Sequence, residues 1–244
     1  MTVKFNKTNC TDEKWLGRAH CEKCHIRYMM LFSELPETAF NHLLHPINHF
    51  LFPAGSTLLN AGNNGMSIYS IRQGIVKLIH TAQDGTQRIV RLLGPGACIG
   101  LELLDGSSTY HYSAVGLSKI DLCKIPIETI QQLETEQPLL SKQIRNLIQE
   151  QLDLADQWII QLGSGPAKQR VAQLLIIMSE NFSDKNAAFI LLSREDMAAI
   201  IGIAFENISR LIAEFKRLAI LTKTDDGLYT CDVEALQDIV LKHK

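Results

Sequence analysis

The stretch LLSREDMAAIIGIAFENISRLIAEFKRLAIL, residues 191–221, decides the architecture of the C-terminal part of this chain. Ser193 is a helix-capping residue type, and Asp196 stands three positions later, as in a capping box. Apolar residues recur at helical spacing until Gly202, and a second helix is expected over about residues 204–217. The residues of this second helix that turn inward are Ile208, Leu211, Ile212 and Phe215. Two short helices joined across a glycine predict a helix-turn-helix.

The opposite face of the second helix carries polar side chains in its first turns. Arg210 has the donors for guanine O6 and N7, Glu206 accepts from cytosine N4, and Ser209 serves either role. Glu206 and Arg210 are four residues apart, which on its own is typical of a solvated ion pair. The helix-turn-helix context favours DNA bases instead. Because the net charge is only −2, any DNA binding must be a local property of this surface.

At this point FENISRLIAEF, residues 205–215, resembles the recognition helix of the CRP/FNR superfamily of bacterial transcription regulators, in its FNR branch with the pattern E-x-x-S-R. The resemblance extends over nearly the whole chain. It implies an α+β fold: an N-terminal antiparallel β-roll of the cyclic-nucleotide-binding type, a long dimerisation helix and a C-terminal winged helix-turn-helix. It also implies a homodimer that binds double-stranded DNA at a palindrome with TTGAT-like half-sites, with RNA polymerase as a further partner.

The same resemblance assigns base contacts to Glu206, Ser209 and Arg210. Further residues expected at the DNA surface, mainly for contacts with phosphates, are Ser193, Arg194, Lys216 and Arg217. The charges of Arg194, Lys216 and Arg217 are nearly as typical of ordinary solvated side chains. Turn residues in LTKTDDGLYTCD, residues 221–232, are typical of the wing.

Short apolar segments alternate with glycine-containing turns between Gly55 and Gly116, with Asp84-Gly85 at one hairpin tip. This pattern predicts a small antiparallel barrel or roll. The sequence GSGPA at 163–167 ends one helix and begins another. We therefore divide the chain into an N-terminal arm, a sensor roll, a dimerisation helix and a DNA-binding domain, over residues 1–30, 31–137, 138–163 and 164–244.

The expected long helix carries an apolar stripe whose spacing is typical of a short coiled-coil seam. The residues of this predicted seam are Ile144, Leu147, Gln151, Leu154 and Trp158. Periodicity alone fits equally well a helix that packs on its own roll. Ala155 lies between Asp153 and Asp156, and because alanine adds no repulsion across a two-fold axis, we hypothesise a dimer that depends little on the sensor.

The stretch AHCEKCHIR, residues 19–27, places Cys21 and Cys24 at a spacing typical of metal ligands. The six cysteines are unevenly spaced and no export signal precedes them, so reduced thiols or metal ligands are expected rather than disulfides. By resemblance to the FNR branch, Cys21, Cys24 and Cys123 imply a redox-responsive site that holds a [4Fe-4S] cluster. The third N-terminal cysteine of the family falls on Met30. Candidates for the fourth ligand are Cys10, His20 and His25.

Other functions remain open for the sensor. In one alternative, the regulator acts without a cluster, either constitutively or by sensing nitric oxide through haem or thiol oxidation. In another, the cysteine pair forms a redox disulfide or binds zinc. Cyclic AMP is not expected, because Leu101 and Tyr112 replace the glutamate and arginine of the cyclic-nucleotide branch. The sequence has no catalytic motif and no apolar run near the roughly 18 residues of a membrane span, so a cytoplasmic non-enzyme is expected.

Overall fold

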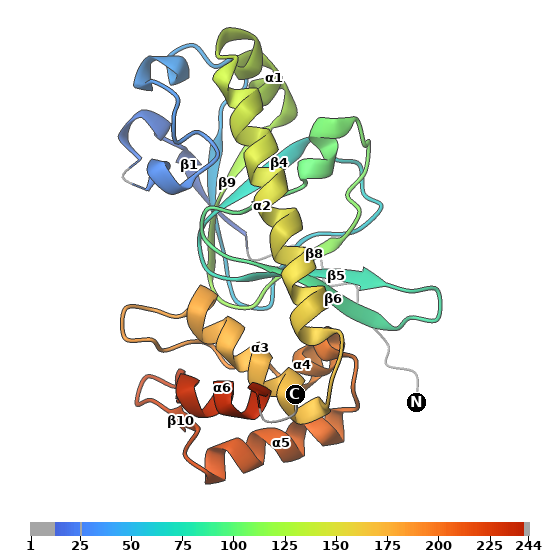
Figure 1. Cartoon of the computed structure of the whole chain (residues 1–244). Coiled ribbons are helices and arrows are strands. Elements are labelled where there is room, and N and C mark those ends of the chain that lie inside the picture. Colours follow the sequence, from blue (N-terminus) through green and yellow to red (C-terminus); the bar gives the residue numbers. More distant parts are fainter. Residues whose placement is uncertain (1–12, 25, 242–244) are drawn as a thin grey trace. The chain divides into compact units, whose positions relative to one another are not determined.

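The computed structural model describes residues 13–24 and 26–241 (Figure 1). The chain separates into two compact units, one with residues up to 79 and 92–147, the other with residues 80–91 and from 148 onward. The strands of the N-terminal region are β1 Lys14–Arg18, β2 Asn48–Phe52, β3 Thr57–Leu59, β4 Ser67–Gln73, β5 Val76–Thr81, β6 Gln87–Leu93, β7 Cys98–Ile99, β8 Ser113–Gly116 and β9 Ile120–Pro126. Its short 3₁₀ helices are η1 Cys21–Lys23, η2 Arg27–Met29, η3 Glu37–Phe40 and η4 Leu101–Asp105.

The strands form the antiparallel roll that the sequence predicts. A five-stranded sheet has the order β1-β2-β9-β4-β7, and a four-stranded sheet has the order β3-β8-β5-β6. The β5–β6 connection turns at the expected hairpin tip, where Gly85 has a φ of 83° and the Thr86 N–H donates to the Asp84 carboxylate at 2.9 Å. The pairing of β4 with β9 shifts register between Ile71 and Gln73, so the strand bulges at Arg72.

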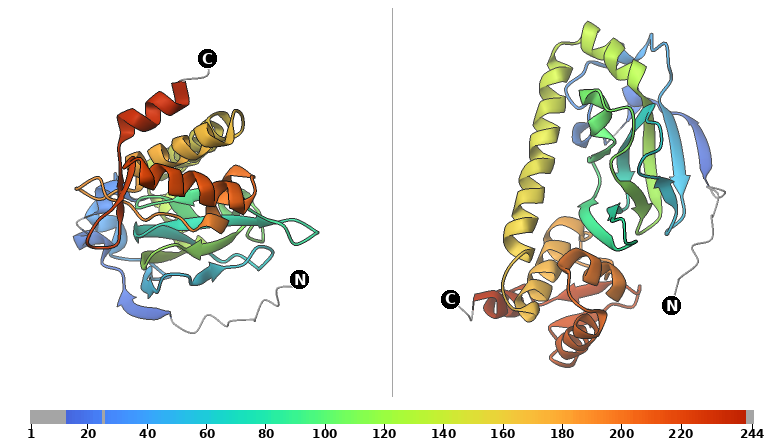
Figure 2. Two further views of the ribbon diagram at one scale, coloured as in Figure 1. Left: turned by 90° about the horizontal axis from the view of Figure 1, so that it is seen from below. Right: turned by 90° about the vertical axis from the view of Figure 1, so that its right-hand side faces the viewer.

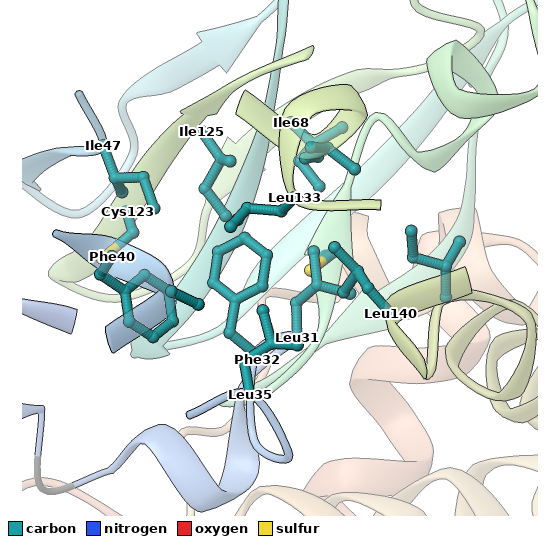
Figure 3. Packing of buried hydrophobic residues seen from close by; sticks show 14 of the residues in the cluster. Leu31, Phe32, Leu35, Phe40, Ile47, Ile68, Cys123, Ile125, Leu133 and Leu140 are labelled. Atoms are coloured by element: carbon teal, nitrogen blue, oxygen red, sulfur yellow. The ribbon is translucent and has the colours of Figure 1, made fainter. Parts of the chain in front are cut away.

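An apolar core anchors the roll on one side of the five-stranded sheet. It joins the segment from Leu31 to Phe40 with β4, β9, α1 (Ile127–Glu136) and the start of α2 (Leu139–Leu162). Figure 3 shows this packing, with Cys123 beside Ile47 and Phe40 in the cluster. The rings of Phe32 and Phe40 meet edge to face with centroids 5.7 Å apart. The segment after the cysteine stretch is therefore part of the packed core from Leu31 onward, and Cys21 packs against this core.

The C-terminal region contains the predicted helix-turn-helix. Its elements are α3 Ala167–Phe182, α4 Arg194–Ile201, α5 Phe205–Arg217, β10 Leu221–Lys223, β11 Tyr229–Cys231 and α6 Val233–Leu241. The Ser193 hydroxyl accepts the Asp196 N–H at 3.0 Å, which is the predicted cap of α4. Gly202 ends α4 with a φ of 75°, a left-handed conformation that favours glycine. Antiparallel β10 and β11 form the wing.

The right-hand view of Figure 2 shows α2 as one continuous helix. In the described part of the chain, no helix is both long enough and apolar enough to cross a lipid bilayer.

Candidate DNA interface and sulfur-lined sensor site

Helix α5 presents its polar residues because its apolar face is fully used inside the domain. Ile208, Ile212 and Phe215 have no exposed surface, and Leu211 is 6% exposed. On the other face Glu206 and Arg210 are exposed and Ser209 is half-buried. Arg210 Nη2 donates to the Asn207 side-chain oxygen at 3.4 Å. This arrangement leaves a row of exposed donors and acceptors, and Asn207 is a neighbour of the row that sequence reasoning did not include.

The residues expected at phosphates have more varied surroundings. The Ser193 hydroxyl is engaged as the α4 cap. Arg194 is half-buried, and this burial lowers the pKa of its guanidinium. Lys216 Nζ donates to the Tyr229 hydroxyl at 2.9 Å, which lowers the pKa of that hydroxyl. Arg217 is exposed in the last turn of α5. Lys216 and Arg217 are thus both exposed, and Lys216 links the recognition helix to the wing.

The three described cysteines of the predicted sensor lie around one cavity of about 30 Å³ in the N-terminal unit. Cys21 is the first residue of η1 and Cys24 directly follows it, and Cys123 lies on β9 opposite Ser70 of β4. Met30, which stands at the position of the family's third N-terminal cysteine, lines the same cavity. The Ser70 hydroxyl points at the Met30 sulfur at 3.9 Å. The fold thus gathers three thiols and a thioether from segments about 100 residues apart in the sequence.

Arg72, at the β4 bulge, is the residue that sequence reasoning missed. Its Nη1 donates to the Cys24 sulfur at 3.2 Å and lies 4.0 Å from the Cys123 sulfur. Its Nε forms an ion pair with Asp121 Oδ1 at 3.1 Å, and His49 Nε2 lies 2.5 Å from the same oxygen. A cation is thereby held among the sulfurs by an acidic partner on β9. No local sequence signal marks Arg72, because the contact depends on the register of β4 and β9.

Burial and charge set the protonation of these thiols. Burial raises the pKa of Cys21 to about 12, with a smaller contribution from Cys123 and Cys24. Burial also raises the pKa of Cys123 to about 11, although Arg72 opposes this shift. Burial alone would lower the pKa of Arg72, but Cys123, Cys24 and Asp121 raise it overall. At neutral pH, Cys21 and Cys123 are therefore neutral thiols, and thiols react more slowly than thiolates.

The described side chains do not fit a [4Fe-4S] cluster as they stand. Such a cluster takes four ligands, usually thiolates. Within residues 13–24 and 26–241, no group of three or more His, Cys, Asp or Glu side chains is placed to hold a metal ion. The Arg72 guanidinium lies against two of the three sulfurs. Of the proposed fourth ligands, His20 is exposed and lies beside Glu22, whereas Cys10 and His25 fall outside the described residues.

The remaining cysteines are separate from this site. Cys98 is 1% exposed on β7, as expected for a buried small residue, and Cys231 is half-buried on β11. Leu101 and Glu102 lie in the 3₁₀ helix η4. Leu101 is 8% exposed, and the Glu102 carboxylate accepts the His111 N–H at 3.0 Å.

Three residues of the predicted seam of α2 are buried within the single chain. Within the protomer Ile144, Gln151 and Trp158 are buried, at 6%, 8% and 7% exposure, and Leu147 and Leu154 are half-buried. Arg91 donates to the Gln151 side chain at 3.2 Å. These side chains are used inside their own chain, which is the alternative that the periodicity left open. The exposed apolar residues of α2 that follow heptad spacing are instead Ile148, Leu152 and Ile159, with half-buried Ala155 between them.

Comparisons with known proteins agree with this fold and with the helix-turn-helix domain. Residues 50–136 match the family model of the cyclic nucleotide-binding domain, and residues 169–239 match that of the Crp-like helix-turn-helix domain. The chain is 26% identical over 211 residues to the Fumarate and nitrate reduction regulatory protein of Salmonella typhi, covering 83% of this chain and 82% of the relative. A Vibrio cholerae protein of that name is 26% identical over 208 residues, covering 83% of each chain.

Solved structures show the same fold. FixK2 from Bradyrhizobium japonicum matches with a TM-score of 0.69 at 18% identity, over 79% of this chain and 96% of that chain. A CRP/FNR-family transcriptional regulator from Thermus thermophilus matches with a TM-score of 0.63 at 23% identity, over 79% and 97%. Taken with the buried and exposed faces of α5, the two domain matches and the curated relatives lead to one assignment. The chain belongs to the CRP/FNR family of DNA-binding transcription regulators, which are not enzymes.

Proposed function

We propose that this protein is a homodimeric regulator that reads a palindrome with TTGAT-like half-sites and adjusts its DNA binding to the redox state of the sulfur-lined site. The observation that carries the DNA part is the division of α5 into a buried apolar face and an open polar face. Glu206, Ser209 and Arg210 are the proposed base readers. Arg194 and Arg217 are the proposed phosphate contacts, with Lys216 supporting the wing, and RNA polymerase is a proposed partner.

The proposed dimer contact is the exposed apolar stripe of α2. Ile148, Leu152 and Ile159 are 41%, 52% and 70% exposed, and their spacing of four and seven residues brings them onto one side of the helix. Two copies of α2 related by a two-fold axis bury these side chains against each other. Because a two-fold protein matches a two-fold site, this contact supports recognition of a palindrome.

The redox input rests on the gathering of Cys21, Cys24 and Cys123 around Arg72. Oxidation of two of these thiols forms the S–S bond and passes two electrons and two protons to an oxidant such as a hydroperoxide, whose O–O bond breaks to give an alcohol and water. A disulfide removes the thiol contacts of Arg72 and repacks the cavity wall. That wall includes Leu31, Phe32 and Ile125, which belong to the core on which the start of α2 packs.

One experiment tests both the DNA binding and the redox input of this proposal. Protein purified without oxygen is assayed for iron and acid-labile sulfide, and its affinity for a TTGAT-type palindrome is measured before and after hydrogen peroxide. We expect a change in affinity that is lost in Cys24→Ser and Cys123→Ser but kept in Cys231→Ser, since Cys231 lies on the wing. Affinity that peroxide does not alter, in metal-free protein, would refute the thiol input. Bound iron and sulfide that are lost in Cys21→Ser would instead establish the cluster.

A further inference from the structure

Arg170, in the first turn of α3, contacts the ends of two other helices in the C-terminal unit. Its Nε donates to the carbonyl oxygen of Leu162 at 2.5 Å, and its Nη2 donates to that of Ile201. Leu162 is the last residue of α2, and Ile201 is the last residue of α4. Carbonyls at a helix C-terminus lack partners within the helix and carry partial negative charge. A half-buried guanidinium therefore satisfies both ends at once.

The two carbonyls matter for different reasons. The Leu162 carbonyl ends α2, and the exposed stripe of α2 is the proposed contact with the second copy. The Ile201 carbonyl is followed by Gly202 in a left-handed conformation, and α5 begins at Phe205. Because this turn is short, the position of the Ile201 carbonyl fixes where the recognition helix starts. Arg170 is thus the side chain that joins the dimer helix directly to the turn before the recognition helix.

We propose that Arg170 is a positioning residue that sets the separation of the two recognition helices, and hence the spacing of half-sites that the dimer accepts. The inference rests on the proposed function, because it assumes a dimer through α2 and base reading by α5. Arg170 does not read DNA. Its loss leaves the residues of α5 in place but lets α5 take several positions relative to α2.

The adjacent residue supplies a matched control. Gln169 lies in the same turn of α3, and its side chain donates to the Val240 carbonyl of α6 at 3.2 Å. This bond has the same type of acceptor but involves neither α2 nor α4. Gln169→Ala therefore removes a side-chain hydrogen bond from the same turn to a helix carbonyl without freeing the recognition helix.

The test uses a set of DNA duplexes whose two half-sites are separated by spacers that increase one base pair at a time. Fluorescence anisotropy gives the Kd of the full-length dimer for each spacer. We expect a sharp optimum for the unsubstituted protein and for Gln169→Ala. Arg170→Gln should bind the optimal spacer about tenfold more weakly, since two charge-assisted hydrogen bonds are lost, while spacers one base pair away change little. Base preference within each half-site should stay the same.

Arg170→Lys is the conservative variant and should restore part of the optimum, because an ammonium donates to either carbonyl. If Arg170→Gln does not fold, the spacer profile of Arg170→Lys decides alone: a broadened optimum supports the proposal. An equal loss of affinity at every spacer, or an unchanged profile in the folded variants, would overturn it. Failure of the unsubstituted protein to bind any spacing would overturn the proposed function itself, which is a different result.

Discussion

Ile159→Ser should separate the dimer without unfolding the protomer. Ile159 is 70% exposed in the single chain and lies on the heptad stripe of α2. Complete burial of an isoleucine side chain contributes about 1.5 to 3 kcal/mol, so covering the exposed part contributes about 1 to 2 kcal/mol per protomer. The two-fold axis doubles this to about 2 to 4 kcal/mol per dimer. The dimer Kd should therefore rise by a factor of about 30 to 700.

Sedimentation equilibrium over a range of concentrations measures that Kd. Ile160→Ser is the matched control, because Ile160 is 74% exposed but lies one residue off the stripe. Trp158→Ala distinguishes the exposed stripe from the seam predicted from the sequence. Because Trp158 is 7% exposed, its truncation should lower the urea midpoint of the protomer. Equal weakening of the dimer by Ile159→Ser and Ile160→Ser, or no weakening by Ile159→Ser, would refute the reasoning.

Three further substitutions follow from the sites. Arg210→Ala should weaken binding to the palindrome by about 1 to 3 kcal/mol and relax discrimination at one guanine, measured by competition among half-site variants. Phe215→Ala, at a fully buried position, should lower the free energy of unfolding by about 3 to 5 kcal/mol in urea titration. The raised pKa values of Cys21 and Cys123 contribute stability below about pH 9 that is lost as the pH rises toward 11 to 12. The unfolding midpoint should therefore fall less over this range in the Cys21→Ser/Cys123→Ser double variant.

Local patterns predicted the DNA-binding half well because its signals are short in range. The Ser193 cap, the break at Gly202 and the four inward residues of α5 all involve neighbours within about four positions along one helix. The hairpin tip at Asp84-Gly85 is local in the same sense. The structure has each of these features at the position predicted from the sequence.

The seam on α2 shows the limit of such patterns. The stripes through Trp158 and through Ile159 both have the period of an amphipathic helix, and the sequence does not tell which one packs on the chain itself. That choice depends on tertiary contacts, such as the bond from Arg91 to Gln151. The helix is therefore confirmed, whereas the stripe that contacts a second copy stays a proposal.

The sulfur-lined site was predicted only in part, for a related reason. Cys21, Cys24 and Cys123 were found by their residue type and by family resemblance, but the cation among them depends on the bulge of β4 against β9. Arg72 changes the chemistry of the group, because an iron–sulfur cluster bound by thiolates would have to displace a guanidinium that Asp121 holds in place. Arg72→Gln therefore separates the two chemistries: it should favour a cluster by removing the cation, whereas for a thiol switch it should slow oxidation by removing the charge that stabilises a thiolate.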